Sequence, residues 1–588
     1  MTSDPGADRS SGTTVDGPGR DERDRERLAV VESYADRVLE TGRDRWSGEG
    51  TPLLADGVHV DTHEPVTWQY EGEEFAISNL ASQQNLFRAL DGLSELTGDA
   101  GYRNAAEAAV EYHFDHLVDG SGLLRWGGHQ FVDLRTLDPV GEFDADVHEF
   151  KCHFPYYDLL WDVDPDATRR FLRAVWEAHV LDWSTLDMNR HGEYDRDAGG
   201  AEPPWDREFA DPDPFFVGEG LSFVNIGSDL VHAAGVLHEL GDEPDAWEWG
   251  ERLAAMYVKA RHPETGLGAY QYTKPRRRDE PPEEGPLPTT SNYGDRAENQ
   301  FGDQFGDVAR EGWVLWGGKV PTIYVRNGLV QLRLSERLGA DGARLRRWTV
   351  DGLEALADHA YDPAENEFRP MWADGTDLTG RTFDRSGYYG ESGTAWQPVP
   401  AGAEFLLVYA LAYRLTGRER LRETARAIAR GLGIGELGAT PGDEPNVATD
   451  VTGGQDGDAD RDNDADRDND ADRDGDGASD GGATEIFALL ELYRATNRPE
   501  YVERARNVAD RIVEDRYHHG FFLPSADHVN AKFDAVEPLA LLALDAVLRG
   551  EPDAVPPYVG GSGYVHGRFD GHGRTRDSRV IWPKTCEE

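Results

Sequence analysis

Two histidines, a glutamate and an arginine in the first third of the chain have residue types and spacing suited to binding a metal ion and moving a proton. His129 follows two glycines in "WGGHQ", Glu149 lies in "DVHEFKCH", and Arg190 directly precedes His191 in "MNRHGEY". Neutral imidazole nitrogen and carboxylate oxygen bind divalent Mn, Fe, Co, Ni or Zn without selecting sharply among them. We therefore expect a metal site here, and the residue types alone leave open which histidines bind.

The stretch around Glu149 also contains a scarce lysine. Only six of the 60 basic side chains are lysine, and one of them is Lys151. In an extended chain Glu149, Lys151 and His153 would point to one side, and the alternate residues to a largely apolar side. Lys151 is therefore a candidate to meet an anionic substrate.

Four further residues are candidates for substrate contact or catalysis. Lys319 follows two glycines between aromatic residues in "LWGGKVPTIY", and Arg261 and Tyr270 flank a glycine-rich segment in "ARHPETGLGAYQY". Trp126 directly precedes the glycines before His129, and tryptophan and tyrosine rings stack on sugars. For each of them the alternative is a loop or core residue without a catalytic role.

A repeated helical plan must position these residues. An apolar helix ends near Thr-Gly or Thr-Asn, a turn follows, and a second helix continues with alanine at helical spacing. The copies span residues 93–117, 411–432 and 490–513, with looser copies at 235–261 and 332–361. We predict an all-α fold, an (α/α) toroid of six to seven helical hairpins, with short strands in the loops that line a cleft.

The hydrophobic pattern also predicts the domain organisation. Residues 1–23 have no hydrophobic periodicity and are expected to be a disordered tail, followed by one catalytic toroid over residues 24–550 and a C-terminal extension over 551–588. An aspartate-rich repeat lies within a predicted disordered insertion, residues 438–482. It resembles a calcium-binding ladder, but Ala483 stands where an EF-hand loop started at Asp472 needs its bidentate glutamate.

The composition argues against nucleic acid as a partner. The 588 residues include 112 acidic side chains and have a formal net charge of -52, so the chain would repel nucleic acid. Such a surface is typical of a salt-adapted protein of the haloarchaeal type, because high ionic strength screens the repulsion among carboxylates. The charge thus indicates habitat more than a partner, and nothing in the composition predicts the oligomeric state.

Two further features concern the compartment. The N-terminal residues lack the apolar core of a signal peptide, and the two cysteines, Cys152 and Cys586, cannot form a disulfide framework. No apolar run approaches the roughly 18 residues that a membrane span needs. We predict a cytoplasmic protein without a membrane segment.

The series of His129, Glu149 and the Arg190-His191 pair, with gaps of 20 and 42 residues, resembles the family 2 polysaccharide lyases, the pectate disaccharide-lyases. In that family an (α/α)7 barrel holds a catalytic metal through a His, a Glu and a second His that directly follows an Arg. The resemblance covers roughly residues 50 to 330. It implies that His129, Glu149 and His191 are the metal ligands and that Arg190 is the catalytic base.

The resemblance also implies a reaction, β-elimination on a pectate-like uronate through loss of the C5 proton. A divalent cation held by two neutral imidazoles and one carboxylate keeps positive charge, so it would neutralise the substrate carboxylate. Arginine has a pKa above roughly 12, although burial and a nearby cation disfavour its charged form. If Arg190 stays charged it clamps the carboxylate, and Lys151 or a hydroxide on the metal is the base instead.

Two other classes of function remain open. Another α/α-toroid sugar enzyme could be an epimerase of the N-acylglucosamine 2-epimerase type, with paired histidines as acid and base, or an unsaturated uronyl hydrolase, with paired carboxylates. A non-catalytic carbohydrate-binding scaffold would keep the toroid without the chemistry. Bound metal together with an unsaturated product distinguishes the lyase from all of these.

Overall fold

The structure is a computed structural model that describes residues 18–70, 73–141, 145–195, 203–280, 282, 290–438, 440, 442–448, 482–526, 528–561, 565–569 and 574–576. Most of the N-terminal tail and of the acidic insertion predicted above lies outside the described residues, as does part of the C-terminal extension. Within the segments predicted to be disordered, residues 22–23 instead begin a helix, Glu22–Thr41, and Asn446–Val447 form a strand. The disorder of the undescribed parts of the tail and the insertion stays a prediction.

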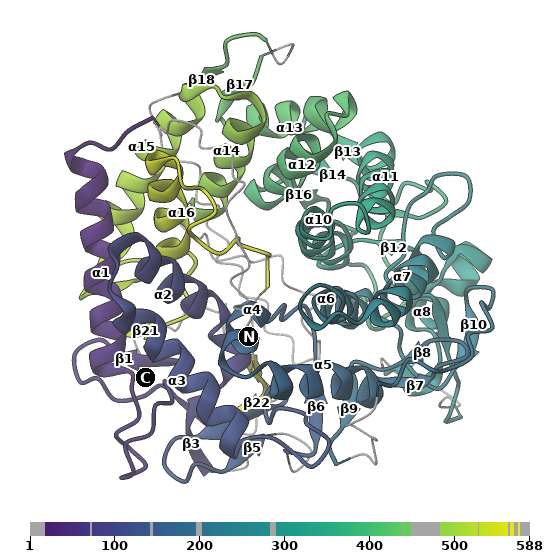
Figure 1. Ribbon diagram of the computed structural model, residues 1–588. Coiled ribbons are helices and arrows are strands. Elements are labelled where there is room, and N and C mark those ends of the chain that lie inside the picture. Colours follow the sequence, from purple (N-terminus) through teal and green to yellow (C-terminus); the bar gives the residue numbers. More distant parts are fainter. Residues whose placement is uncertain are drawn as a thin grey trace, which may run out of the picture.

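Helical hairpins dominate the described residues and form a ring (Figure 1). The inner helices are α2 (Gln84–Thr97), α4 (Tyr157–Val163), α6 (Val224–Gly241), α10 (Asn327–Arg337), α12 (Ala403–Thr416), α14 (Ala483–Thr496) and α16 (Glu537–Arg549). Their outer partners are α3 (Ala100–His116), α5 (Pro165–His179), α7 (Pro244–Lys259), α11 (Ala343–His359), α13 (Glu419–Gly431), α15 (Pro499–Arg516) and α1 (Glu22–Thr41). The predicted α/α toroid is confirmed.

The repeated Thr-Gly and Thr-Asn dipeptides end three inner helices for a common physical reason. Gly98, Gly417 and Asn497 cap α2, α12 and α14 in the left-handed conformation, with φ of 78°, 67° and 55°. Glycine and asparagine tolerate this conformation, which lets the chain reverse into the outer helix. The turn residues that stood out in the sequence are thus the hairpin turns of the toroid.

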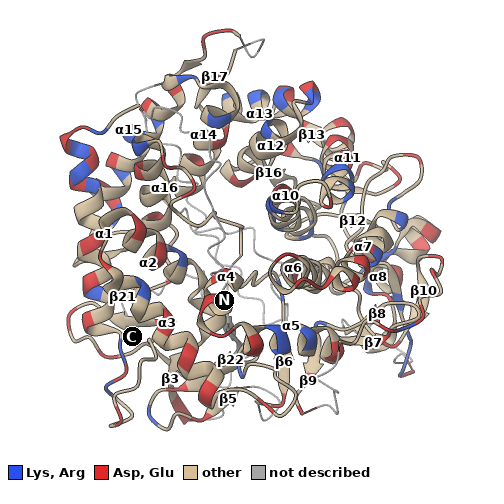
Figure 2. Cartoon of the chain, in the orientation of Figure 1, with Lys and Arg blue, Asp and Glu red and all other residues tan. Residues whose placement is uncertain are grey.

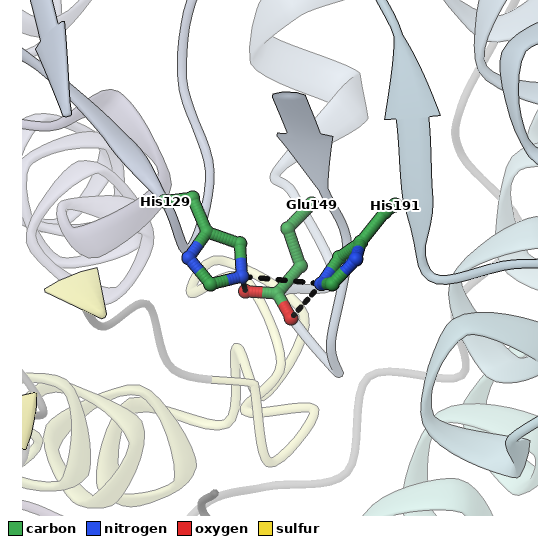
Figure 3. Close-up of side chains that lie close together, drawn as sticks. All are labelled: His129, Glu149 and His191. Atoms are coloured by element: carbon green, nitrogen blue, oxygen red, sulfur yellow. Dashed lines mark hydrogen bonds and ion pairs between the residues drawn. The ribbon is translucent and has the colours of Figure 1, made fainter. Parts of the chain in front are cut away.

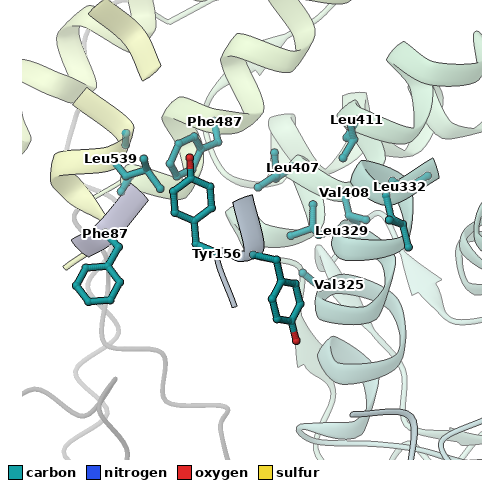
Figure 4. Packing of buried hydrophobic residues seen from close by; sticks show 14 of the residues in the cluster. Phe87, Tyr156, Val325, Leu329, Leu332, Leu407, Val408, Leu411, Phe487 and Leu539 are labelled. Carbon is teal, nitrogen blue, oxygen red and sulfur yellow. The ribbon is translucent and has the colours of Figure 1, made fainter. Parts of the chain in front are cut away.

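The ring closes through helices from opposite ends of the chain. α1 packs on α16, which also packs on α2 and α14. The inner helices are buried along most of their length, and their apolar side chains form one core (Figure 4). The residues labelled there are Phe87, Tyr156, Val325, Leu329, Leu332, Leu407, Val408, Leu411, Phe487 and Leu539. Burial of this shared core holds the hairpins together.

Shorter helical segments and 3₁₀ turns lie in the connections. α8 (Arg296–Phe305) follows a long loop, and α9 (Lys319–Pro321) continues through a π-helical turn, Thr322–Arg326, directly into α10. Short 3₁₀ turns precede α2 at Leu80–Ser82 and α8 at Ser291–Tyr293. Lys319 is therefore the first residue of an inner helix.

The strands are short and lie in the loops between hairpins, as predicted. A six-stranded sheet has the order β23-β22-β2-β3-β4-β5, and the other strands form sheets of two or three. The strands are β1 (Gly57–His59), β2 (Thr67–Tyr70), β3 (Glu73–Ser78), β4 (Gln130–Asp133), β5 (Pro139–Gly141), β6 (Val147–Glu149), β7 (Val180–Asp182), β8 (Asp187–Met188), β9 (His191–Glu193), β10 (Phe216–Gly218), β11 (Thr273–Pro275), β12 (Val314–Leu315), β13 (Tyr361–Asp362), β14 (Glu367–Phe368), β15 (Met371–Trp372), β16 (Val399–Pro400), β17 (Gly435–Glu436), β18 (Asn446–Val447), β19 (Tyr517–His518), β20 (Phe521–Phe522), β21 (Asn530–Lys532), β22 (Val565–Phe569) and β23 (Arg574–Arg576).

A cavity of about 820 Å³ is lined by the C-terminal halves of several inner helices and by residues 552–559. Charged side chains of both signs line it, and many form ion pairs between helices. None of the polar residues singled out in the sequence as ligands or catalytic groups lines this cavity. Among the described residues, no helix combines the length and apolar character that crossing a membrane requires.

Candidate metal centre and catalytic site

Two short antiparallel strands bring the predicted ligands together. β6 pairs with β9 in a register that places Glu149 opposite His191, and His129 lies immediately before β4. The chain at Gly127 runs beside the same strand through a parallel bridge to Glu149. Gly127 has φ of 127°, and a Cβ there would lie 2.6 Å from the Glu149 carbonyl oxygen. Glycine is therefore required for His129 to reach the strand pair.

The side chains of His129, Glu149 and His191, here called the His-Glu-His triad, converge on one point (Figure 3). Their ligand atoms all lie within 4.8 Å of one another. The two Nε2 atoms are 3.1 Å apart, and the Glu149 carboxylate oxygens lie 3.5 Å from His129 Nε2 and 3.6 Å from His191 Nε2. Ligands at about 2.1 Å around a tetrahedral ion are separated by about 3.4 Å, so these positions fit a bound transition metal.

Burial and charge also suit the triad to a cation. Glu149 is fully buried and His129 is 5 % exposed, whereas His191 is only partly buried. Burial, opposed by the hydrogen bond to Glu149 and supported by Arg190, lowers the pKa of His191. A neutral imidazole is the form that binds metal. Two imidazole nitrogens that face each other at 3.1 Å need a proton or a cation between them, because two lone pairs at this distance repel each other.

Arg190 lies at the edge of the triad. Its Nε is 3.1 Å from a Glu149 carboxylate oxygen and 3.3 Å from His191 Nε2. The carbonyl oxygen of Arg190 also accepts the Phe150 amide at 3.3 Å, which continues the strand pairing. The structure therefore brings all four residues of the sequence pattern into contact.

A chain of buried hydrogen bonds anchors the segment that carries Arg190. Trp126 Nε1 donates to His148 Nε2 at 3.1 Å, His148 Nδ1 is 2.8 Å from His179 Nε2, and His179 Nδ1 is 2.8 Å from the Asn189 carbonyl oxygen. An indole nitrogen only donates, so each imidazole accepts at Nε2 and donates from Nδ1. Burial lowers the pKa of His148 well below its ordinary value. His148 and His179 thus use both ring nitrogens in this chain, which supports the segment before Arg190.

The extended geometry predicted for residues 148–153 is wrong beyond Glu149. His148 and Phe150 do lie on the core side, where both rings contact His179. Cys152, however, has φ of 58°, which breaks the alternation of an extended chain. The Lys151 amide donates to His153 Nδ1 at 2.9 Å, so the chain turns sharply after Lys151. His153 therefore stabilises this turn through its Nδ1 atom.

A second charged cluster lies beside the first and contains Lys319. Its Nζ is 3.1 Å from the Glu311 carboxylate and 3.9 Å from the centre of the Tyr270 ring. Arg296 contacts the same carboxylate, with Nε at 3.0 Å from both oxygens. Burial would raise the pKa of Glu311, but Arg296 and Lys319 outweigh it and lower the pKa to about 2. Two cations therefore share one ionised carboxylate.

Phe223 joins the two clusters. The guanidinium carbons of Arg190 and Arg296 lie 6.0 Å and 5.5 Å from the centre of its ring, and Tyr270 contacts the ring at 5.0 Å. Arg296 was not singled out in the sequence, because arginine is common in this chain. Its one local signal is Asp295, which caps α8 by accepting the Ala297 and Glu298 amides.

The remaining predicted residues lie away from the triad ligands. Trp126 is fully buried beneath the site, and Tyr270 is 1 % exposed and faces Lys319. The Arg261 guanidinium lies against α11, where a Cβ on Gly352 would be 2.9 Å from it. These three residues do not present a free ring or guanidinium to solvent, so their contact with a sugar stays a prediction. Lys151 is 6 % exposed and lies two residues after Glu149.

Comparison with known proteins shows that most of the chain is similar to pectate lyases. A family model described as periplasmic pectate lyase matches residues 51–456 and 462–568. The chain is similar to a pectate disaccharide-lyase of Dickeya dadantii, with 33% identity over 579 residues that cover 95% of this chain and 96% of that protein.

Solved structures include more distant likenesses. An α-mannanase from Bacteroides thetaiotaomicron has 7% identity and a TM-score of 0.38 over 90% of this chain and 96% of its own. A cellobiose 2-epimerase from Bacillus thermoamylovorans has 9% identity and a TM-score of 0.37 over 69% of this chain and 90% of its own.

Proposed function

Because this chain belongs to the family of periplasmic pectate lyases and is a polysaccharide lyase, we propose that it cleaves pectate or oligogalacturonate-type uronates by a metal-dependent β-elimination. The observation that carries the proposal is the convergence of the His-Glu-His triad with Arg190. Three segments of the chain supply these groups, and their positions match the needs of one reaction.

The triad would hold the metal. Two neutral imidazoles and one carboxylate offer the nitrogen and oxygen donors that suit Mn, Fe, Co, Ni or Zn, and the partly exposed side of His191 leaves a direction from which substrate can approach. When bound, the cation would neutralise the uronate carboxylate and stabilise the charge that develops on it. The two positive charges of the cation exceed the single negative charge of Glu149, so the cation would remain available to an anion.

Arg190 is the proposed base. Its side chain lies at the edge of the triad, where the C5 proton of a uronate held at the metal would be within reach. It would act as the neutral guanidine, the form that burial and a neighbouring cation favour. Removal of that proton breaks the C5–H bond, its electron pair forms the C4–C5 double bond, and the oxygen on C4 leaves and takes a proton. Lys151 is the second candidate for the base, because it lies two residues after Glu149.

The second cluster would supply positive charge to the same polyanion. Arg296 and Lys319 share the carboxylate of Glu311, so these three side chains together carry one net positive charge. Burial, with a contribution from Glu311, raises the pKa of neighbouring Asp295 to about 6, so the positive charge of the cluster increases when Asp295 takes up a proton below that pH. We propose that Lys319 and Arg296 face the carboxylate of a sugar next to the one that reacts, since Arg190 and Arg296 both lie against the Phe223 ring, which also contacts Tyr270.

Loss of one ligand tests the proposal directly. We expect purified wild type to contain about one transition metal ion per chain, and the His129→Ala variant to lose both the metal and the cleavage of polygalacturonate. The loss of rate should exceed the about 10–100-fold that removal of an outer partner of a metal ligand causes. Metal is measured by elemental analysis, and cleavage by the ultraviolet absorbance of the unsaturated product.

The exposed His359, at the end of α11, gives a matched control, since His359→Ala should keep both metal and rate. A wild type that contains no metal and leaves polygalacturonate intact, even after divalent ions are added back, would contradict the proposal. That result would favour an epimerase or a binding protein.

A further inference from the structure

The turn that follows the ligand strand has a strained backbone. Cys152 and Phe154 both have positive φ, 58° and 44°, within three residues. Left-handed backbone costs a residue other than glycine about 1–3 kcal/mol, and it persists only where the surroundings impose it. An aromatic residue is among the least suited to it. Something in the fold must therefore hold residues 151–154 in this shape.

One buried carboxylate holds the turn. Asp229, in the first half of α6, accepts the Cys152 amide at 2.7 Å and the His153 amide at 3.4 Å on Oδ2, and the Phe154 amide at 2.9 Å on Oδ1. Three consecutive amides thus point at one side chain that is fully buried. An extended chain could not aim three successive amides at one carboxylate, because its amides alternate in direction.

Residues of other elements also contact the turn. Arg88 on α2 donates to the Phe154 carbonyl oxygen at 2.8 Å. A Cβ on Gly561 would lie 2.5 Å from the His153 carbonyl oxygen, so residues of the C-terminal extension pack directly against the turn. Cys152 and Phe154 themselves pack with Val330 and Val559. Of the described groups, Asp229 is the one that reaches three amides of the turn.

We propose that Asp229 is a positioning residue that fixes the Cys152–Phe154 turn and thereby holds Lys151 on the side of Glu149 where substrate binds. The inference rests on the proposed function for the role of Lys151, but the positioning itself does not depend on it. Glu149 is fixed by pairing with His191, whereas Lys151 lies beyond the strand and depends on the turn.

The energetics support a positioning role. Burial, opposed by the amides of the turn, raises the pKa of Asp229 to about 7. A buried carboxylate is a costly way to fill the core, since an apolar residue of similar volume would pack there without losing hydration. Two left-handed residues add to that cost. Such costs concentrate at sites where geometry matters more than stability.

The scarcity of lysine makes the positioning measurable. Protein labelled with ¹⁵N only in lysine has six backbone amide signals, and the Lys151 amide carries a distinctive hydrogen bond to an imidazole nitrogen. In the Asp229→Asn variant we expect the Lys151 signal to move and the other five to stay. The metal content should stay at the wild-type level, and kcat on polygalacturonate should fall by about 10–100-fold, as for a misplaced catalytic group.

A double-mutant comparison separates positioning from general damage. If Asp229 acts through Lys151, the Asp229→Asn/Lys151→Ala double variant is no slower than Lys151→Ala alone, because coupled residues are not additive. Glycine adopts positive φ without strain, so Cys152→Gly should restore part of the lost kcat in the Asp229→Asn background. If Asp229→Asn alone folds poorly, the Cys152→Gly/Asp229→Asn double variant is compared with Cys152→Gly instead.

Asp44 provides a matched control. It is also buried and accepts three backbone amides, from Trp46, Ser47 and Thr51, but in a turn near the N-terminus. Asp44→Asn should lower stability without moving the Lys151 signal.

Two results would overturn the proposal. One is an unmoved Lys151 signal in Asp229→Asn, and the other is full additivity with Lys151→Ala. If wild type does not cleave polygalacturonate, the proposed function fails, and the lysine signal still decides whether Asp229 positions Lys151.

Discussion

At the scale of single residues, the candidate metal centre is balanced in charge before any cation is added. Glu149 contributes one negative charge and Arg190 one positive charge at 3.1 Å. The lowered pKa of His191 keeps that imidazole neutral. A divalent cation would therefore give the site a net positive charge inside a chain whose total formal charge is -52. This local excess is what a polyanionic substrate requires.

The role of Arg190 can be separated from that of the metal ligands. In Arg190→Lys we expect metal content to stay near the wild-type level, because the triad is intact. We expect kcat to fall by about 10²–10⁴-fold, the usual contribution of a positioned acid or base, since an ammonium does not reproduce the planar guanidinium. Elemental analysis and initial rates on polygalacturonate give the two values.

Arg125 supplies the control for this prediction. Its guanidinium lies over Tyr194 and pairs with Asp195, which is largely exposed. Arg125→Lys should keep most of the activity. Loss of metal from Arg190→Lys would instead make the arginine part of the metal site.

At the scale of elements, short strands carry the candidate metal ligands, whereas buried ion pairs connect the inner helices to one another. Glu491 on α14 is buried and pairs with Arg333 on α10 at 2.8 Å and with Arg414 on α12. Arg414 also reaches Glu336 on α10 at 2.6 Å. Three neighbouring inner helices thus meet at one carboxylate, and its loss would leave two cations poorly compensated.

The protonation of Glu491 should set part of the acid stability. Burial alone would raise its pKa, but Arg333 and Arg414 outweigh burial and lower the pKa to about 2. A carboxyl group with a lowered folded-state pKa stabilises the fold above its ordinary pKa, and this contribution is lost as the pH falls towards 2. Glu491→Gln should therefore lower Tm most near pH 7, where the free energy of unfolding should fall by about 3–5 kcal/mol.

Thermal unfolding followed by circular dichroism between pH 3 and pH 7 tests this expectation. The difference in Tm between wild type and Glu491→Gln should shrink as the pH falls. Glu423 is exposed and its contact with Arg420 is long, 3.8 Å, so Glu423→Gln should show little difference at any pH. A constant gap for Glu491→Gln would show that the lost packing, and not the charge, matters.

At the scale of the whole molecule, acidic side chains are spread over all the hairpins (Figure 2). Repulsion among them destabilises the compact state at low salt. The screening length falls from about 10 Å at 0.1 M salt to about 3 Å at 1 M, so added salt should remove much of this repulsion. Salt adaptation and a cytoplasmic location stay predictions for this chain.

We expect Tm to rise steadily when KCl is increased from about 0.1 M to about 2 M, because the repulsion among carboxylates extends over about 10 Å at the lower concentration. Calorimetry measures the shift. Sucrose at matched water activity is the control, since it stabilises folded proteins without screening charge. An equal rise in sucrose, or no rise in KCl, would show that charge repulsion does not limit the stability of this protein.

The sequence by itself determined the hairpins, and its resemblance to the pectate disaccharide-lyases indicated the candidate ligands. Caps such as Gly98 and Gly417 act within one turn of chain, so the helical hairpins could be predicted from local pattern. The order of His129, Glu149 and His191 and the gaps of 20 and 42 residues between them can be read from the sequence, and these are the features that carry the resemblance.

The tertiary structure alone decided which distant groups meet. It closed the ring by packing α1 on α16, and it placed Arg296 and Lys319 beside Arg190 across Phe223. It also imposed the left-handed turn at Cys152 through Asp229 on α6, against the extended geometry that alternation predicted. These contacts join residues far apart in the chain, and local periodicity carries no information about such partners.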